Sequence, residues 1–131
     1  MAGNAHRTRI FLSRWFLRFD RKTGIKDADL CKAIRLAELG LIHANLGGSV
    51  IKQRIPRPNK GKSGGIRSIV LFQAGNKAFF VYGFLKNERD NLRVDEVNGF
   101  KTLAEEMFVY DSDTLANALT RGFIVEVKCN E

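Results

Sequence analysis

Three segments rich in β-branched and aromatic residues follow one another between residues 50 and 84, and they constrain the fold more than any other feature. The first ends at Pro56 and Pro58, which cannot continue a strand ladder, and Ala74-Gly75-Asn76 has the composition of a tight turn. Short links of this kind join antiparallel neighbours. The sequence therefore predicts a three-stranded antiparallel meander, with strands at 50–55, 66–72 and 77–84.

Helical patterns flank this meander on both sides. A weakly alternating stretch at 7–12 predicts one more strand, followed by a short helix that Ser13 would cap and Thr23-Gly24 would end. Asp27 is expected to cap a second helix, which ends near Gly40. Further apolar patterns predict helices at 97–108 and 112–122 and an edge strand at 123–127.

The fold class that follows is α+β. We expect a small antiparallel sheet of about four strands, with the N-terminal helices packed on one face and a C-terminal helix. A chain of 131 residues with 44% hydrophobic and 27% charged residues is expected to form a single domain, 1–131.

Two cysteines, Cys31 and Cys129, lie far apart and in no metal-binding or redox spacing, so two reduced thiols are predicted. No apolar run approaches the length of a membrane span, and the N-terminal residues do not resemble a signal peptide. The sequence thus favours a cytoplasmic protein without membrane contact.

The charge distribution is strongly asymmetric. The net charge is +8, and no acidic residue occurs between Glu38 and Glu88. Residues 95–131 contain eight acids and three bases, so residues 1–94 carry a net charge of +13. Because self-repulsion opposes folding, such a distribution favours a polyanionic partner.

The triplet Gly61-Lys62-Ser63 resembles the end of a nucleotide-binding P-loop, but the rest of that motif is absent. Pro56 stands where the first glycine is required, and a strand follows the triplet where a helix is required. We therefore expect no nucleotide cofactor.

Basic residues are expected to converge on one face of the meander. Lys52 and Arg54 share a strand face, roughly 6.5–7 Å apart, which is close to the spacing of successive phosphates. Arg67 begins the next strand, and Lys86 and Arg89 follow the last one. These cations occur on consecutive strands, which favours a phosphate site over a merely solvated sheet face.

Conventional catalytic sets are missing from the sequence. His6 and His43 have no neighbouring carboxylate or cysteine, so each is interpreted as an ordinary surface or core residue. There is no carboxylate cluster for Mg²⁺ and no nucleophile elbow. RNA carries its own nucleophile, the 2′-hydroxyl, and a lysine crowded by cations becomes a base near neutral pH. A site of lysine and arginine that cleaves RNA without a metal is therefore chemically reasonable.

Four sequence blocks resemble the RelE-like toxins of bacterial toxin–antitoxin modules, most closely the HigB-like subgroup. The blocks are GGSVIKQRI, GKSGGIRSIVLF, FFVYGFLKNERDNL and LAEEMF, and the resemblance spans residues 9–108, leaving 109–131 as a C-terminal extension. It implies an α+β fold, mRNA cleavage assisted by the ribosome, and a cognate antitoxin of the helix-turn-helix type.

The resemblance also implies roles for individual residues. Lys52 and Arg54 match the positions of the base and the phosphate ligand, Arg67 matches a transition-state arginine, and Arg89 lies in the segment of a further catalytic arginine. Asn87 stands at that arginine's own position, and no late tyrosine for base stacking is found. Expected contacts to the RNA backbone are Arg57, Lys60, Lys62, Lys86 and Asn87.

Two other functions use the same fold. A ParE-like toxin would inhibit DNA gyrase without cleaving nucleic acid, and a non-catalytic module would only bind RNA or DNA. The converging cations favour the ribonuclease, because gyrase inhibition does not require a phosphate site.

Overall fold

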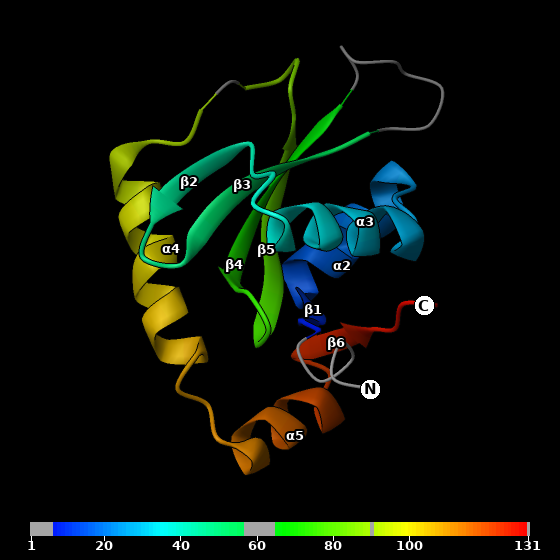
Figure 1. Cartoon of the computed structure of the whole chain (residues 1–131), viewed down its shortest axis with the longest axis vertical. Coiled ribbons are helices and arrows are strands. Elements are labelled where there is room, and N and C mark those ends of the chain that lie inside the picture. Colours follow the sequence, from blue (N-terminus) through cyan, green and yellow to red (C-terminus); the bar gives the residue numbers. More distant parts are fainter. Residues whose placement is uncertain (1–6, 57–64, 90, 131) are drawn as a thin grey trace.

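The predicted meander forms the centre of a larger sheet in the computed structural model, which describes residues 7–56, 65–89 and 91–130 (Figure 1). The strands of the meander are β3 (Val50–Ile55), β4 (Ile66–Gln73) and β5 (Lys77–Leu85). Each pairs antiparallel with the next. Residues 74–76 form the predicted turn between β4 and β5. The local prediction of three consecutive strands is confirmed.

The complete sheet is mixed and has six strands in the described part of the chain, in the order β2-β3-β4-β5-β1-β6. The prediction of about four strands, all antiparallel, is therefore wrong. β1 (Arg9–Ser13) lies parallel to β5, and β2 (Ala44–Gly47) pairs with β3. The parallel pairing joins residues more than 60 positions apart, and it leaves no local signature in the sequence. The expected edge strand is confirmed as β6 (Ile124–Val127), antiparallel to β1.

In the ranges that the structure describes, four helices surround this sheet: α2 (Arg14–Thr23), α3 (Asp27–Glu38), α4 (Val94–Met107) and α5 (Ser112–Thr120). Ser13 caps α2 as predicted, since its Oγ accepts a hydrogen bond from the Phe16 amide at 3.1 Å. The expected cap at Asp27 is displaced by one residue, because Lys26 is the N-cap and its amide donates to Asp29 Oδ2. None of these helices combines the length and apolarity needed to cross a bilayer.

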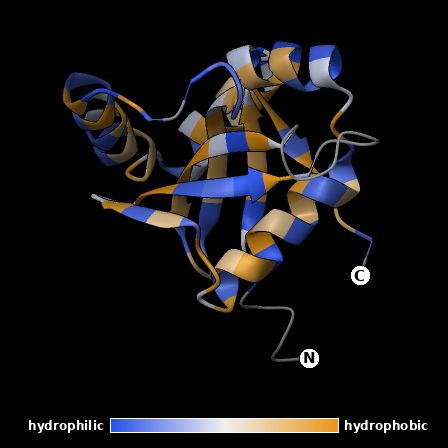
Figure 2. Ribbon diagram, turned by 90° about the horizontal axis from the view of Figure 1, so that it is seen from above, coloured by the Kyte–Doolittle hydropathy of each residue, from blue (hydrophilic) through white to orange (hydrophobic). Residues whose placement is uncertain are grey.

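The helices cover both faces of the sheet. One apolar cluster packs α2 and α3 against Ile10, Ile51 and Phe80, and a second packs α4 and α5 against Phe79 and Leu71. Figure 1 shows α4 on the opposite side of the sheet from α2 and α3. Figure 2 shows hydrophobic and hydrophilic residues side by side along both the helices and the strands. The N-terminal helices α2 and α3 thus pack on one face as predicted, and the C-terminal helices cover the other, because both sheet faces carry apolar side chains.

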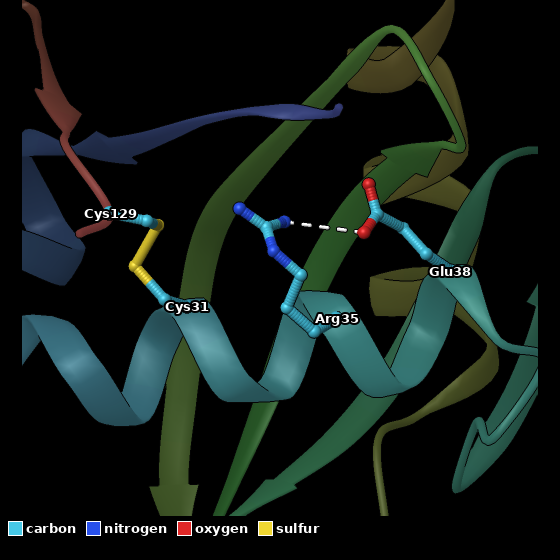
Figure 3. Close-up of a disulfide and its surroundings, with 4 residues drawn as sticks. All are labelled: Cys31, Arg35, Glu38 and Cys129. Atoms are coloured by element: carbon cyan, nitrogen blue, oxygen red, sulfur yellow. Dashed lines mark hydrogen bonds and ion pairs between the residues drawn. A yellow bond between two sulfur atoms is a disulfide. The ribbon is translucent and has the colours of Figure 1, made fainter. Parts of the chain in front are cut away.

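A disulfide joins Cys31 in α3 to Cys129, just after β6 (Figure 3). The prediction of two reduced thiols is thus wrong. The two residues are 98 positions apart in sequence, yet their Cα atoms lie 6.0 Å apart. Their proximity depends on β6 pairing with β1, which no cysteine spacing reveals. One turn further along α3, Arg35 pairs with Glu38 at 3.3 Å.

Candidate nucleic-acid interface

The cations predicted to converge do lie on one face of the sheet. Arg54 and Arg67 are direct cross-strand partners in the β3–β4 ladder, and Lys52 lies two residues from Arg54 on the same strand face. Arg54 is exposed and Lys52 is half-buried, whereas only 8% of Arg67 is exposed. We call these three residues the cation cluster. The cation cluster lies on the same face of the sheet as α4, next to the part of β3 and β4 that α4 covers.

An irregularity in β5 brings the rings of Tyr82 and Phe84 onto the sheet face that carries the cation cluster. The register with β4 shifts between Ile69, opposite Tyr82, and Val70, opposite Phe80, so Val81 is an extra residue. Strict alternation from Phe80 would direct Phe84 to the α2–α3 side. Because of the bulge, the residues after Val81 point to the opposite faces from those that strict alternation would give, and Phe84 becomes the cross-strand partner of Arg67.

The electrostatics of the cation cluster follow from partial burial and mutual repulsion. Burial, and then the charge of Arg67, lower the pKa of Lys52 below its usual range. Burial and the charge of Arg54 likewise lower the pKa of Arg67. Within the described residues no carboxylate pairs with any of the three, and the Lys52 ammonium instead donates to Asn91 Oδ1 at 3.4 Å. The cluster is therefore suited to bind a phosphate and to hold a lysine that gives up its proton more readily.

His43 also lies at this site, although nothing in the sequence around it had singled it out. Arg54 Nε donates a hydrogen bond to His43 Nδ1 at 3.1 Å. The pKa of His43 is lowered by burial and by the charges of Arg54, Arg67, Lys52 and Lys86. A neutral imidazole whose Nδ1 accepts from Arg54 carries its proton on Nε2, where it can donate to a ligand.

The position of His43 is fixed from the opposite side of β3. Its backbone amide donates to Gln53 Oε1 at 2.9 Å, and Gln53 is only 3% exposed. The Gln53 amide group donates in turn to the carbonyl oxygens of Ala33 and Leu41. Gln53 is the one polar residue between Ile51 and Ile55 on the buried face of β3. This was the sequence signal that another segment, the one before β2, hydrogen-bonds to β3 at this point.

Arg89 lies beside the cation cluster in a different environment. Its guanidinium lies 5.6 Å from the centre of the Phe84 ring and donates to Tyr82 Oη at 3.3 Å. It also forms a two-point ion pair with Glu96 of α4, with 3.2 Å between Nη1 and Oε2. The hydrogen bond from Arg89 and one from the Arg93 amide lower the pKa of Glu96 to about 2. Glu96 therefore neutralises part of the charge of Arg89.

The remaining predicted contacts are placed as follows. Lys86 and Asn87 are exposed in a turn after β5, where the Lys86 amide donates to the Gly65 oxygen at 3.1 Å and the Glu88 amide to the Leu85 oxygen at 3.0 Å. The backbone of residues 86–88 therefore forms a turn and does not continue the strand. Arg57, Lys60 and Lys62 lie outside the described residues. Across the described ranges, no three His, Cys, Asp or Glu side chains gather as a metal site.

The fold and this geometry define a class of protein, a small α+β protein with a cluster of cations on one sheet face. The family model for the RelE toxin of the RelE/RelB toxin–antitoxin system matches residues 8–127, so the chain belongs to the RelE toxin family. It is a toxin of a toxin–antitoxin system, and the resemblance seen in the sequence blocks is confirmed. A comparison with curated proteins finds no match.

Proposed function

We propose that this toxin is a metal-independent endoribonuclease that cleaves mRNA on the ribosome and so inhibits translation. The observation that carries the proposal is the convergence of Lys52, Arg54 and Arg67 on one sheet face, with no carboxylate partner among the described residues. A fold alone gains nothing from such an arrangement, whereas a phosphodiester satisfies all three groups.

In this mechanism Lys52 is the general base. Its lowered pKa increases the fraction of neutral amine near neutral pH, and the amine accepts the proton of the 2′-hydroxyl. The 2′-oxygen then bonds to phosphorus as the bond from phosphorus to the 5′-oxygen breaks. The products are a 2′,3′-cyclic phosphate and a 5′-hydroxyl, whose proton comes from water.

The arginines stabilise the charge that develops on the phosphate. Arg67 is held nearly buried by its strand and faces Arg54 across the ladder, so two guanidinium groups are positioned before the RNA arrives. Arg89 is assigned to the leaving 5′-oxygen. Because Glu96 neutralises part of its charge, its contribution is smaller than that of Arg67.

The rest of the RNA strand is bound by residues around the cluster. We assign backbone contacts to Arg57, Lys60, Lys62, Lys86 and Asn87, of which Lys86 and Asn87 are exposed beside the site. The partner that silences the toxin is a cognate antitoxin, of the RelB type by family or of the helix-turn-helix type by the sequence blocks. An acidic segment of that antitoxin covering the cation cluster would account for neutralisation.

The deciding experiment is inducible expression followed by mapping of mRNA 5′ ends. New ends within translated regions are expected for the wild-type toxin and should disappear in Arg67→Ala. Arg93→Ala is the matched control, because Arg93 is exposed and pairs with Asp95. Growth arrest without new ends, together with inhibited supercoiling by purified gyrase, would overturn the proposal in favour of a gyrase inhibitor.

Chelation provides a second, independent test. Cleavage by purified toxin on programmed ribosomes is measured after EDTA treatment of the toxin alone, followed by removal of the chelator, because ribosomes themselves need Mg²⁺. Unchanged cleavage is expected. Activity lost in this way and restored by a divalent ion would overturn the metal-independent mechanism.

A further inference from the structure

A row of aromatic rings leads from the cation cluster to an exposed tryptophan on α2. Phe84, the cross-strand partner of Arg67, has its ring centre 6.2 Å from that of Tyr82. Tyr82 is in turn 4.6 Å from Trp15, whose other ring neighbour, Phe19, lies 5.2 Å away. Trp15 remains 38% exposed. The row thus ends in a large ring that is supported on its inner side and open to solvent.

The backbone explains why Trp15 lies there. The β1–β5 ladder ends at the Leu12–Phe80 pair, so the last residues of β5 have no neighbouring strand on that side. α2 begins immediately afterwards and packs across this part of β5. A Cβ atom at Gly83 would lie 2.5 Å from the Phe19 ring, so only glycine permits this approach. The position of Trp15 is therefore set by close packing.

The surface of α2 around Trp15 is cationic. Arg14, Arg18 and Lys22 are exposed, and the one acid in the helix, Asp20, is only 8% exposed. Arg18 and Lys22 follow Trp15 at helical spacing and lie on the same side of the helix. No carboxylate in the described residues pairs with these three cations. An exposed aromatic ring among unpaired cations matches single-stranded nucleic acid, which offers flat bases and phosphates together.

We propose that Trp15 is a base-stacking platform for single-stranded RNA flanking the cleaved phosphate, with Arg14, Arg18 and Lys22 contacting the neighbouring phosphates. Tyr82 and Phe19 hold the ring and are not themselves the stacking surface. The inference rests on the proposed ribonuclease function and adds a strand path from the cation cluster, over the edge of β5, to α2. Stacking is tolerant of base identity, so the platform positions RNA without selecting a sequence.

Trp15 is the only tryptophan of the chain, so its fluorescence reports on the platform directly. The purified toxin is titrated with a 2′-O-methyl RNA decamer, which cannot be cleaved, and with an abasic decamer of equal charge. Quenching is expected with the base-containing strand and not with the abasic strand. Quenching of equal size by both would overturn stacking, because only the phosphates would then be responsible.

Affinity is measured separately by anisotropy of the same decamers carrying a fluorescent label. Trp15→Ala is expected to weaken binding of the base-containing decamer roughly 5- to 150-fold, the range for losing one stacked base, and to leave abasic binding unchanged. Trp15→Phe should retain most of the affinity. Val109→Ala is the control, because Val109 is an exposed apolar residue in the segment between α4 and α5 and takes no part in the row of aromatic rings.

Failure of this inference is distinguishable from failure of the proposed function. Wild-type affinity in Trp15→Ala, with mRNA cleavage intact, would overturn the platform alone. Loss of antitoxin binding in Trp15→Ala with unchanged RNA affinity would also overturn it, by making the surface a protein-docking site. Absence of cleavage by the wild-type toxin would overturn the ribonuclease, while the quenching experiment would still decide whether Trp15 stacks on RNA.

Discussion

Two groups of basic residues lie near each other in this toxin and differ in the charge of the side chains that pair with them. In the cation cluster of Lys52, Arg54 and Arg67, the polar neighbours identified are neutral, namely Asn91 and His43. At the start of α4, by contrast, Arg89 and Arg93 are both paired with carboxylates. The first group keeps its charge available for a ligand, whereas the second uses its charge within the protein.

The second group has a clear structural role. Glu96 accepts a hydrogen bond from the Arg93 amide at 2.8 Å, which caps α4, while it also holds Arg89. Its pKa of about 2 lies below the ordinary value of 4.5, so its contribution to stability is present above pH 4.5 and is lost as the pH falls towards 2. Counting arginines along the sequence therefore cannot separate functional from structural cations, because the position of the carboxylates decides.

The largest effect is expected from Lys52→Arg, which keeps the charge and removes the base. If Lys52 accepts the 2′-hydroxyl proton, single-turnover cleavage on programmed ribosomes should fall by about 10²–10⁴-fold, since arginine does not deprotonate. The wild-type rate should rise with pH and level off below the ordinary lysine pKa of 10.5, because that pKa is lowered here. A rate near wild type would reduce Lys52 to a phosphate ligand.

A slightly smaller loss is expected from Arg67→Ala. Removing one preorganised donor to the phosphate should reduce the cleavage rate by about 10²–10³-fold without unfolding the protein, because Arg67 lies outside the apolar clusters. Circular dichroism checks the fold, and Arg93→Ala is the control from the paired group. Equal losses in the two variants would remove the distinction between the groups.

Arg89→Ala is expected to cost about tenfold in cleavage rate, the order of one charge-assisted hydrogen bond. Glu96 already neutralises part of the Arg89 charge, so the effect should stay below that of Arg67. The companion variant Glu96→Gln leaves Arg89 without its counter-charge and should tighten RNA binding a few-fold. Weaker binding in Glu96→Gln would show that the ion pair, and not the free charge, supports the site.

The smallest effect concerns pH. The pKa of His43 is lowered in the free toxin by burial and surrounding cations, and a bound phosphate would raise it again. RNA binding should therefore take up a proton, and affinity should increase by roughly two-fold as the pH falls from about 7.5 to 6, because only one proton is linked and its uptake is partial. His43→Asn should abolish this dependence. An unchanged pH slope in that variant would exclude His43 from RNA binding.

Much of the site could be predicted from the sequence, because its key residues lie on β3 and β4, which are consecutive in the chain and pair with each other. Alternation alone placed Lys52 and Arg54 on one face, and the next strand supplied Arg67 opposite Arg54. His43 could not be predicted, because its place depends on a hydrogen bond from its amide to Gln53. The ion pair of Arg89 was missed because Glu96 belongs to a separate helix.

The sequence by itself determined the strands of the meander, the caps that start and end α2, and the excess of positive charge. These are local properties, fixed by side-chain periodicity and by residues such as Ser13 and Gly24. Only the tertiary structure decided the parallel position of β1, the Cys31–Cys129 disulfide and the bulge at Val81 that turns Phe84 towards Arg67. Each depends on contacts between distant segments, whose free energy appears only when the chain has folded.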